Sequence, residues 1–593
     1  MLILSLFFAL VGNWGSGDAR FSYTLRFHPD DTSAVSIRLL VRNAPASMQL
    51  AANAHPEYDD KYWRYVDNMA AATVSGRTLT ISKVDSVRWQ VNNPAGDVVV
   101  TYRVKFPREP RPRASWRPFL ASTGGLVGGP HSFLYIVGLE HAAADVTLDI
   151  PAGWKVATGL DGKSTARHFT APDIYALMES PILVGELSEW MFKAGSTPHH
   201  VFYWRLPEGV PFDSTKFVAG LAKVANGAIA LFGSAPYREY SFLFQDGAWG
   251  GGLEHPNSVT LGAESEQLAR NPLYTLDDAA HEFIHSWNLM SIEPAEYRGV
   301  DYRMQGPVAE LWFSEGLTLF YADLLQRRAG IAMEESTRIA HLETLMQRYL
   351  SSPGNARNSA ERISSVEYNA SPAALGDYTA SAHLVGELLG TIIDLRIRDA
   401  TNGVRSVDDV MRLMYERFTK KKFTSHDVEQ AASETCSCSM ADIFDRHVFN
   451  ASAIAFNRYL VALGLMADVT WEPAVGNDGK PRPDLRAWAW EEDGALKLRV
   501  GDPESIWGKA GLRTGDVIVS VNEAPMKLWP DLRSVMRNIA IGDTVMFVVQ
   551  RDRVRMSRTV VVRGYDRPRV TIRHIDRPSQ RQEKLYRQWI ETR

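Results

Sequence analysis

The pentad His281-Glu282-Phe283-Ile284-His285 constrains the fold of this 593-residue chain more than any other segment. On an α-helix, residues four apart lie on one face, so both imidazoles can reach one metal ion with Glu282 beside the attacking water. At about 100° per residue, the apolar positions 279, 280, 283, 284 and 287 fall on the opposite side. The pattern therefore predicts an amphipathic helix with a metal-binding face and a core face.

A zinc site in a hydrolase usually takes three protein ligands, so a third ligand must come from elsewhere in the chain. Glu315 is the candidate, because it lies in an otherwise apolar helical stretch where an unpaired carboxylate would be costly to bury. Glu293, Glu296 and Glu310 are rivals in more polar surroundings. On the pentad alone, two histidines that are packed or solvated without a metal are the alternative.

A second candidate segment, Gly250-Gly251-Gly252-Leu253-Glu254-His255, combines glycines with a carboxylate. Gly251 and Gly252 allow the backbone to approach a ligand closely, and Glu254 can bind the ammonium group of a substrate's first residue. A peptide held in this way is trimmed from its amino end only. The alternative is a glycine-rich loop with a solvated glutamate and a surface histidine.

The hydrophobic periodicity changes twice along the chain, which predicts a multidomain α+β protein. Strand patterns occupy 21–27, 35–41, 78–82, 98–106 and 146–150, whereas helical patterns occupy 218–232, 276–289, 311–328, 336–350, 383–398 and 407–418. Short strands return beyond 468, and 494–564 has the size of one small β-rich module. We expect an N-terminal β domain at 20–185, a mainly α domain at 186–467, a β-rich domain at 468–570 and a closing helical tail at 571–593.

The first ten residues form one apolar run, followed by several small residues. About ten apolar residues are too few to cross a bilayer of about 30 Å as a helix, but they suit the core of a signal peptide. We therefore predict that residues 1–19 are a signal peptide, that the protein is exported to the periplasm or the medium, and that no stable membrane span is present. A buried first strand is the alternative.

Composition excludes two further classes of protein. The 65 basic and 69 acidic side chains give a net charge of -4 with no basic stripe, so a nucleic acid is not expected as a partner. With only two cysteines, the chain is not a disulfide scaffold. Cys436 and Cys438 are separated by one residue, and we predict two free or irregularly oxidised thiols rather than a bridge.

Several motifs resemble those of the glycyl aminopeptidases, a family of zinc metallopeptidases related to thermolysin. The motifs are HEFIHSWN (281–288), LWFSEGLTLFYADLLQRRAG (311–330), GGLEHPNS (251–258), FDRHVFN (444–450) and YLVALGL (459–465). The resemblance implies an N-terminal β-sandwich-like domain, a mainly α thermolysin-like catalytic domain and a C-terminal PDZ domain. It also implies Zn²⁺ as cofactor and peptides with a free N-terminus as substrates, with small first residues such as Gly and Ala favoured.

By motif, the resemblance makes His281, His285 and Glu315 the zinc ligands, Glu282 the general base and Glu254 the anchor for the α-amino group. The PDZ assignment rests on AGLRTGDVI (510–518) followed by VN (521–522). PDZ domains bind an extended peptide at a sheet edge, so a peptide ligand is one expectation. A PDZ-like module packed on the catalytic domain, without its own ligand, is the other.

The chain departs from the family in the helix at 383–398. Relatives usually place a Tyr three residues before a Gly, and its hydroxyl helps to hold the oxyanion. If Gly386 matches that Gly, His383 stands at the Tyr position, and His383 could donate a similar hydrogen bond. Tyr378 is the alternative donor.

These features favour a zinc aminopeptidase in which Glu282 moves the proton of the attacking water to the leaving amine. Two alternatives remain. One is a zinc endopeptidase, in which Glu254 imposes no restriction to the amino end. The other is a weakly catalytic PDZ-containing protein that binds polypeptides, which the departure at His383 favours.

Overall fold

The computed structural model describes residues 20–28, 30–52, 62–106, 113–162, 165–297, 307–331, 335–367, 371–492 and 494–591. The predicted signal peptide, 1–19, lies outside the described residues. The chain divides into two compact units. The first unit comprises 1–218, 237–278 and 298–304, and the second comprises 219–236, 279–297 and 305–593.

A seven-stranded sheet forms the main element of the first unit. Its strand order is β14 (His168–Ala171), β12 (Ala144–Asp149), β1 (Phe21–Arg26), β2 (Ala34–Val41), β8 (Val98–Lys105), β4 (Val66–Thr73) and β5 (Thr78–Leu79). In β1, β2 and β8 buried and more exposed residues alternate, as expected for strands with one face on a core. The predicted strand at 78–82 is divided into β5 and β6 (Ile81–Lys83).

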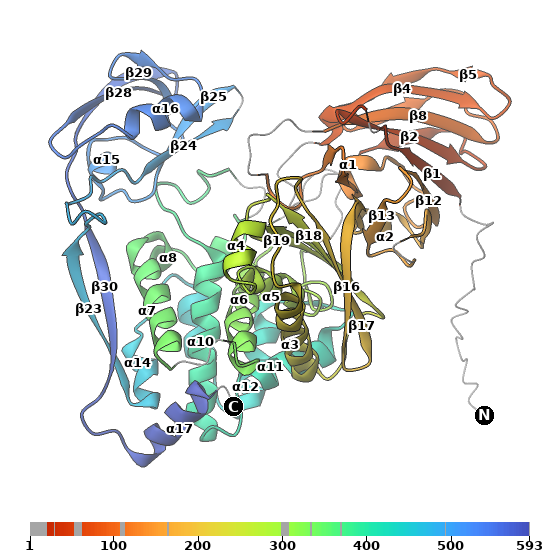
Figure 1. Cartoon of the computed structure of the whole chain (residues 1–593). Helices are drawn as coiled ribbons and strands as arrows, with labels where there is room; N and C mark the ends of the chain where they lie inside the picture. The colour runs from red at the N-terminus through yellow and green to blue at the C-terminus, as the bar shows by residue number, and fades with distance from the viewer. Residues whose placement is uncertain are drawn as a thin grey trace, which may run out of the picture. The chain divides into compact units, whose positions relative to one another are not determined.

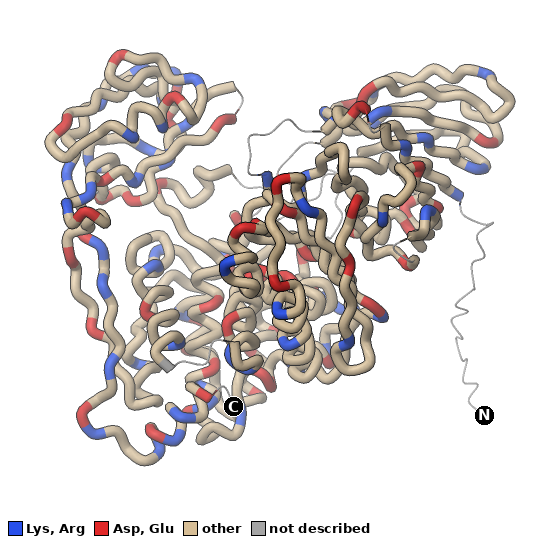
Figure 2. The backbone as a smooth tube through the Cα atoms, in the orientation of Figure 1, with Lys and Arg blue, Asp and Glu red and all other residues tan. Residues whose placement is uncertain are grey.

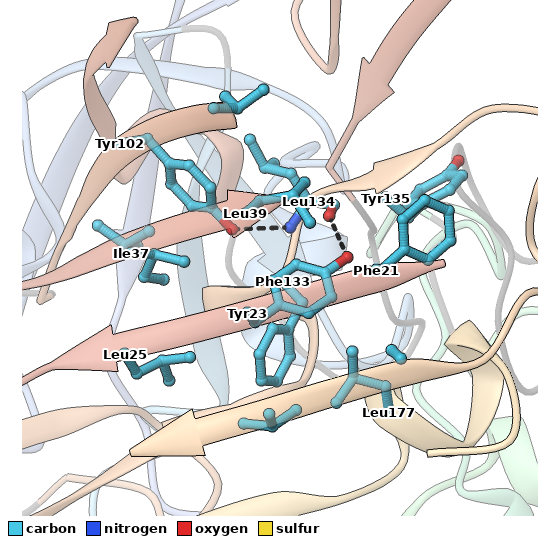
Figure 3. Close-up of a cluster of buried hydrophobic side chains, with 14 of the residues drawn as sticks. Phe21, Tyr23, Leu25, Ile37, Leu39, Tyr102, Phe133, Leu134, Tyr135 and Leu177 are labelled. Carbon is cyan, nitrogen blue, oxygen red and sulfur yellow. Dashed lines mark hydrogen bonds between the residues drawn. The ribbon is translucent and has the colours of Figure 1, made fainter. Parts of the chain in front are cut away.

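Two tyrosines show how polar groups are accommodated in this core (Figure 3). The Tyr23 hydroxyl donates to the backbone oxygen of Leu134 at 2.7 Å. The Tyr102 hydroxyl donates to the backbone oxygen of Ser132 at 2.9 Å and accepts from the backbone N–H of Leu134 at 3.2 Å. Both rings are therefore buried with their hydroxyl groups hydrogen-bonded, which avoids the penalty for an unpaired buried polar group.

Two four-stranded sheets and four short helical segments complete this β region. One sheet has the order β13 (Lys155–Thr158), β15 (Pro181–Gly185), β10 (Gly124–Gly128) and β9 (Phe119–Ala121), and the other has β11 (Tyr135–Ile136), β3 (Met48–Ala51), β7 (Arg88–Val91) and β6. The helical segments are η1 (Tyr62–Tyr65), α1 (Gly129–Ser132), α2 (Ile174–Met178) and α4 (Ser265–Arg270).

A five-stranded mixed sheet lies where the sequence predicted a mainly α domain. Its order is β16 (Leu187–Ala194), β17 (Thr197–Trp204), β18 (Tyr240–Asp246), β20 (Ser258–Ala263) and β19 (Gly252–His255). Every residue of β18 and β20 is buried, and both neighbours of β18 run parallel to it. Strands covered on both faces lack the alternation that identifies half-buried strands, which explains why the pattern did not predict them.

Two helices begin in the first unit and end in the second, namely α3 (Ser214–Phe232) and α5 (Leu276–Ile284). Among the described residues, α3 alone is long and apolar enough for a membrane span by length and composition, and 44% of its window is buried within the structure. Core helices of soluble proteins meet the same criteria, so the prediction of no stable span stays a prediction.

The second unit is built around α6 (Leu311–Arg328) and α10 (Ala382–Thr401), which pack side by side (Figure 1). Other helices around them are α7 (Glu335–Ser351), α8 (Gly354–Arg357), α9 (Ala360–Ser364), α11 (Val407–Phe418), α12 (Ser425–Cys436), α13 (Ala441–Ile443), the π-helical η2 (Phe444–Phe449), α14 (Asn457–Leu460) and η3 (Val461–Leu463). A short parallel pair, β21 (Glu293–Pro294) and β22 (Lys422–Phe423), joins the segment after α5 to the segment before α12.

Glycines set the approach of α6 to α10. A Cβ atom on Gly386 would lie 1.8 Å from the backbone oxygen of Trp312, and one on Gly316 would lie 2.2 Å from the Cα atom of Gly386. Only glycine fits at both positions, because the obstacles are backbone atoms that cannot rotate away. This close crossing brings the second turn of α10 next to the first two turns of α6.

A two-stranded antiparallel ribbon, β23 (Leu465–Pro473) and β30 (Asp566–His574), leads to the last sheet (Figure 1). That sheet has the order β24 (Ala487–Glu492), β25 (Ala495–Val500), β26 (Val517–Val521), β28 (Thr544–Arg551) and β29 (Val554–Val561), with β27 (Ala524–Pro525) paired to β26 and with helices α15 (Ile506–Lys509) and α16 (Trp529–Met536). The chain then returns along β30 and ends in α17 (Gln580–Ile590), which buries Leu585 and Trp589 as the predicted closing helix.

The prediction for the two cysteines is wrong, since Cys436 and Cys438 form a disulfide. Ser437 between them adopts the left-handed conformation at φ 52° as the C-cap of α12. The chain therefore turns sharply enough to place the two Cα atoms 5.1 Å apart, within the usual range for a disulfide. Basic and acidic residues alternate irregularly along the chain (Figure 2).

Candidate active site

Three candidate ligand atoms converge in the second unit. The Nε2 atoms of His281 and His285 are 3.1 Å apart, and an oxygen of Glu315 lies 3.5 Å from the first and 3.4 Å from the second. His281 comes from α5, His285 from the turn that follows it, and Glu315 from the second turn of α6. The structure thus brings together the three residues that the sequence predicted as metal ligands.

The turn after α5 orients His285. The helix ends at Ile284, earlier than the periodicity predicted, and the N–H groups of Ser286 and Trp287 bond the carbonyls three residues back. The Nδ1 atom of His285 lies 2.9 Å from the backbone oxygen of Asn288, a contact that requires a proton on Nδ1. In the neutral ring the Nε2 atom then carries a lone pair, as a metal ligand must.

Asn288 fixes this turn to α6. Its side-chain nitrogen lies 3.1 Å and 3.0 Å from the backbone oxygens of Phe313 and Ser314, and 3.2 Å from the hydroxyl of Thr318. One fully buried amide therefore holds the start of the helix that carries Glu315 against the turn that carries His285. Sequence analysis did not assign this role to Asn288, since no local pattern reveals a contact with residues 25 to 30 positions away.

These three residues fit a zinc ion. Zinc binds histidine nitrogen and carboxylate oxygen at about 2.0–2.2 Å, so donors on a tetrahedron lie about 3.4 Å apart. The three separations of 3.1, 3.4 and 3.5 Å match that spacing. When both Nε2 atoms are unprotonated, the two nitrogens and the carboxylate oxygen have no mutual attraction unless a cation lies between them.

The electrostatics of the cluster suit a cation. Burial lowers the pKa of His281 to about 4, an effect that the hydrogen bond to Glu315 opposes. Burial raises the pKa of Glu315, but the nearby His285 and His383 outweigh that effect and hold the pKa of this carboxyl well below its usual range. A neutral imidazole and an ionised carboxylate are the forms in which these groups bind metals.

Glu282 lies beside the cluster. It follows His281 on α5, is 7% exposed, and has a carboxylate oxygen within 4.8 Å of ligand nitrogens of both His281 and His285. Glu282 is not one of the three candidate ligands, but its carboxylate can reach a small molecule bound next to them. A carboxylate so placed can accept a proton from a water and return it to a leaving group.

His383 also reaches the cluster from α10. Its Nε2 atom lies 3.2 Å from a Glu315 oxygen, and its Nδ1 atom lies 3.5 Å from an oxygen of Glu367. Burial lowers the pKa of His383, but the carboxylates of Glu315 and Glu367 outweigh burial and hold it well above its usual value. The ring is therefore a hydrogen-bond donor at the edge of the candidate metal site.

The remaining predicted residues have other partners or positions. Glu293 pairs with Lys422, and Glu310 interacts with Glu296, so the rivals of Glu315 are engaged elsewhere. Tyr378 is half-buried in a turn, and no contact of its hydroxyl with the cluster is seen in the part of the chain that the structure describes.

Glu254, Gly251 and Gly252 lie in the first unit, on or beside the edge strand β19. Glu254 is 5% exposed, and its Oε1 atom has no hydrogen-bond partner among the described residues. Gly251 adopts φ +99°, and its carbonyl accepts from the Ser115 hydroxyl at 3.1 Å. The proximity of these residues to the cluster of the second unit stays a prediction.

Comparisons with known proteins agree with this site. Family models match at 22–186 (Peptidase M61 N-terminal domain), at 275–385 (M61 glycyl aminopeptidase) and at 495–562 (PDZ domain). The second match contains the three candidate ligands as well as Glu282 and His383. A comparison with curated protein sequences found no match.

A solved structure shares the fold. The aminopeptidase N family protein from Idiomarina loihiensis is 20% identical with a TM-score of 0.74, over 95% of this chain and 99% of that chain. An M1 zinc metallopeptidase from Deinococcus radiodurans with a Tyr-Ser-Ala substrate is 16% identical with a TM-score of 0.46, over 74% and 95% of the two chains. On the family matches, the chain contains the N-terminal domain and the peptidase domain of the M61 glycyl aminopeptidases together with a PDZ domain, and it is a metallopeptidase.

Proposed function

We propose that this protein is a zinc-dependent aminopeptidase that releases the first residue of a peptide, with small residues such as Gly and Ala preferred. The observation that carries the proposal is the convergence of His281, His285 and Glu315 with separations of 3.1 to 3.5 Å. Two histidines and one glutamate form one of the ligand sets of catalytic zinc. When bound, zinc lowers the pKa of a water and polarises the scissile carbonyl.

Each side chain of the site has a role in this proposal. Glu282 accepts the proton of the attacking water and passes it to the leaving amine. His383 donates a hydrogen bond to the oxygen of the scissile carbonyl, where negative charge develops. Glu254 holds the α-amino group, with Gly251 and Gly252 allowing the substrate backbone to approach.

Replacing the general base tests this assignment. The substitution Glu282→Gln keeps the shape of the side chain but removes its basicity, so we expect zinc content to be retained and kcat to fall about 10²- to 10⁴-fold. The matched control is Glu266→Gln on α4, whose side chain is 74% exposed. Activity of the Glu282→Gln protein close to that of the wild type would refute the general-base role.

Blocking the substrate's amine separates an aminopeptidase from the endopeptidase alternative. We expect hydrolysis of unblocked Gly and Ala substrates and none of their N-acetylated forms, because acetylation removes the positive charge that Glu254 recognises. Equal cleavage of both forms would favour an endopeptidase.

We also propose that the protein is exported. The apolar run at 1–10 supports this, and the Cys436–Cys438 disulfide is of a kind that persists in oxidising compartments. N-terminal sequencing of the mature protein from its native host, with a start near residue 20 as the expected result, checks it.

A further inference from the structure

The segment before α10 determines how that helix begins. The Ser381 side chain caps α10 by accepting the N–H of Leu384, and the Ser381 N–H donates to the Asn355 side chain at 3.2 Å. Thr379 is held by the Ser352 hydroxyl, 2.9 Å from its own hydroxyl. Since His383 is the second residue of α10, the position of this segment sets the position of the His383 ring.

The PDZ module contacts the same segment. One carboxylate oxygen of Asp377 accepts the backbone N–H of Thr514 at 2.7 Å, and the other lies 3.3 Å from Nε of Arg513. The Thr514 hydroxyl in turn donates to the backbone carbonyl of Val500 in β25 at 3.0 Å. Asp377 is therefore anchored to a rigid part of the module, and its side chain is only 18% exposed.

The PDZ module also comes close to this segment at Thr379. A Cβ atom on Gly501, directly after β25, would lie 3.3 Å from the Thr379 hydroxyl oxygen. The module's backbone thus lies close to the segment two residues before the Ser381 cap, with no room for a side chain at Gly501 without crowding Thr379. The bonds to Asp377 and the close approach at Thr379 restrict this short segment from the side of the module.

Glu367 links the module to the His383 ring. One of its oxygens lies 3.5 Å from Nδ1 of His383, and the other accepts the N–H of Ala382, the first residue of α10, at 3.4 Å. The charge of Arg499 in β25 interacts with this carboxylate. Glu367 thus contacts both the helix start and the ring nitrogen that faces away from Glu315.

We infer that the PDZ module is a part of the active-site scaffold, and that Asp377 and Glu367 are positioning residues that act through His383. The module holds the 377–381 segment, the segment holds the start of α10, and Glu367 fixes the ring orientation. In this view the module's contact with the catalytic helices is needed for full turnover whether or not it binds a peptide of its own. Only the expected effects on kcat rest on the proposed catalytic role of His383.

Hydrogen exchange in the metal-free, full-length protein tests the structural part without relying on activity. We expect Asp377→Ala to accelerate amide exchange in a proteolytic fragment covering 377–385. The matched control is Asp468→Ala, which removes an exposed ion pair with Arg573 on the ribbon that carries the module. Unchanged exchange in the Asp377→Ala protein would overturn the inference.

Steady-state kinetics test whether the loss of these contacts lowers kcat. We expect Asp377→Ala to lower kcat about 2- to 30-fold with little change in KM, the size typical of coupling through a packed network. Glu367→Ala should lower kcat about 10- to 100-fold, as is usual for a residue that orients a site histidine. In the Asp468→Ala control kcat should stay at the wild-type value.

A double-mutant cycle identifies the route of the effect. In a His383→Ala background, Glu367→Ala should cause no further loss of kcat, because the ring it positions is gone. An equal loss in both backgrounds would show that Glu367 acts elsewhere and would overturn its assignment. A wild-type protein that hydrolyses no substrate would refute the proposed function, and the exchange measurement would still decide the scaffold role.

Discussion

Buried histidines occupy two contrasting environments in this molecule. His199 in β17 of the first unit is fully buried, and each of its ring nitrogens faces one partner: Nδ1 lies 3.0 Å from the Thr197 oxygen and Nε2 lies 3.1 Å from the Tyr237 hydroxyl. A carbonyl accepts the ring proton and a hydroxyl can donate to the other nitrogen. This histidine is satisfied by the protein alone.

His285 in the second unit is buried to a similar degree, and the His281 side chain is 14% exposed. Their Nε2 atoms face each other and the carboxylate of Glu315, so three groups that can bind a cation converge on one point. Burial alone therefore does not distinguish a structural histidine from a metal ligand. The chemical nature of the neighbours does, because two imidazole nitrogens and a carboxylate at this spacing form a set of metal ligands.

The largest expected effect comes from disturbing the helix crossing in the second unit. Gly386→Ala would drive a methyl group into the backbone oxygen of Trp312, so we expect a loss of about 3 kcal/mol in unfolding free energy and a fall in zinc content. Gly227→Ala is the control, since its methyl would meet only the flexible Leu325 side chain at 3.1 Å. Equal stability of the two variants in urea unfolding would contradict the account of the crossing.

Acid should destabilise the environment of His199. Burial lowers the pKa of His199 to about 4, below its unfolded value of about 6.5, so the unfolded chain binds more protons between these values. The contribution of neutral His199 to the free energy of unfolding is present above pH 6.5 and is lost as pH falls toward 4. The loss amounts to about 2 kcal/mol between pH 7 and pH 5.

Native-state hydrogen exchange of the β17 amides measures this loss. In a His199→Gln protein the pH dependence between 7 and 5 should be weaker by the same amount, because the titrating group is absent. A pH dependence identical to that of the wild type would show that His199 titrates normally in the folded protein.

The smallest effect should come from removing one partner of His199. Tyr237→Phe deletes the hydroxyl next to Nε2 and should cost about 1 kcal/mol of unfolding free energy. Zinc content and kcat should not change, since Tyr237 contacts His199 in the first unit, whereas the candidate metal ligands lie in the second unit. A loss of zinc in this variant would contradict the distinction between the environment of His199 and that of the candidate metal ligands.

The parts of the structure that sequence could predict are those with a local signal. The helices at 311–328 and 407–418 have the bounds that their apolar periodicity predicted, and the spacing of His281 and His285 with the unusual burial of Glu315 pointed to the cluster. The resemblance to a known family supplied the PDZ module. Each of these rests on residues close together in the chain.

The parts that could not be predicted depend on contacts across the fold. The hydrogen bonds of Asn288 and the close approach of Gly316 to Gly386 become visible only when α5, α6 and α10 are placed together. The fully buried strands β18 and β20 lack the alternation that marks a half-exposed strand. The Cys436–Cys438 bridge depends on a left-handed Ser437, a conformation that residue type does not indicate.

Anomalous diffraction at the zinc absorption edge, measured on crystals of the purified full-length protein, shows which residues hold zinc. We expect one ion bound by Nε2 of His281, Nε2 of His285 and a carboxylate oxygen of Glu315, each at about 2.0–2.2 Å. A structure with no ion between these three residues, or with zinc held by a different set, would contradict this expectation.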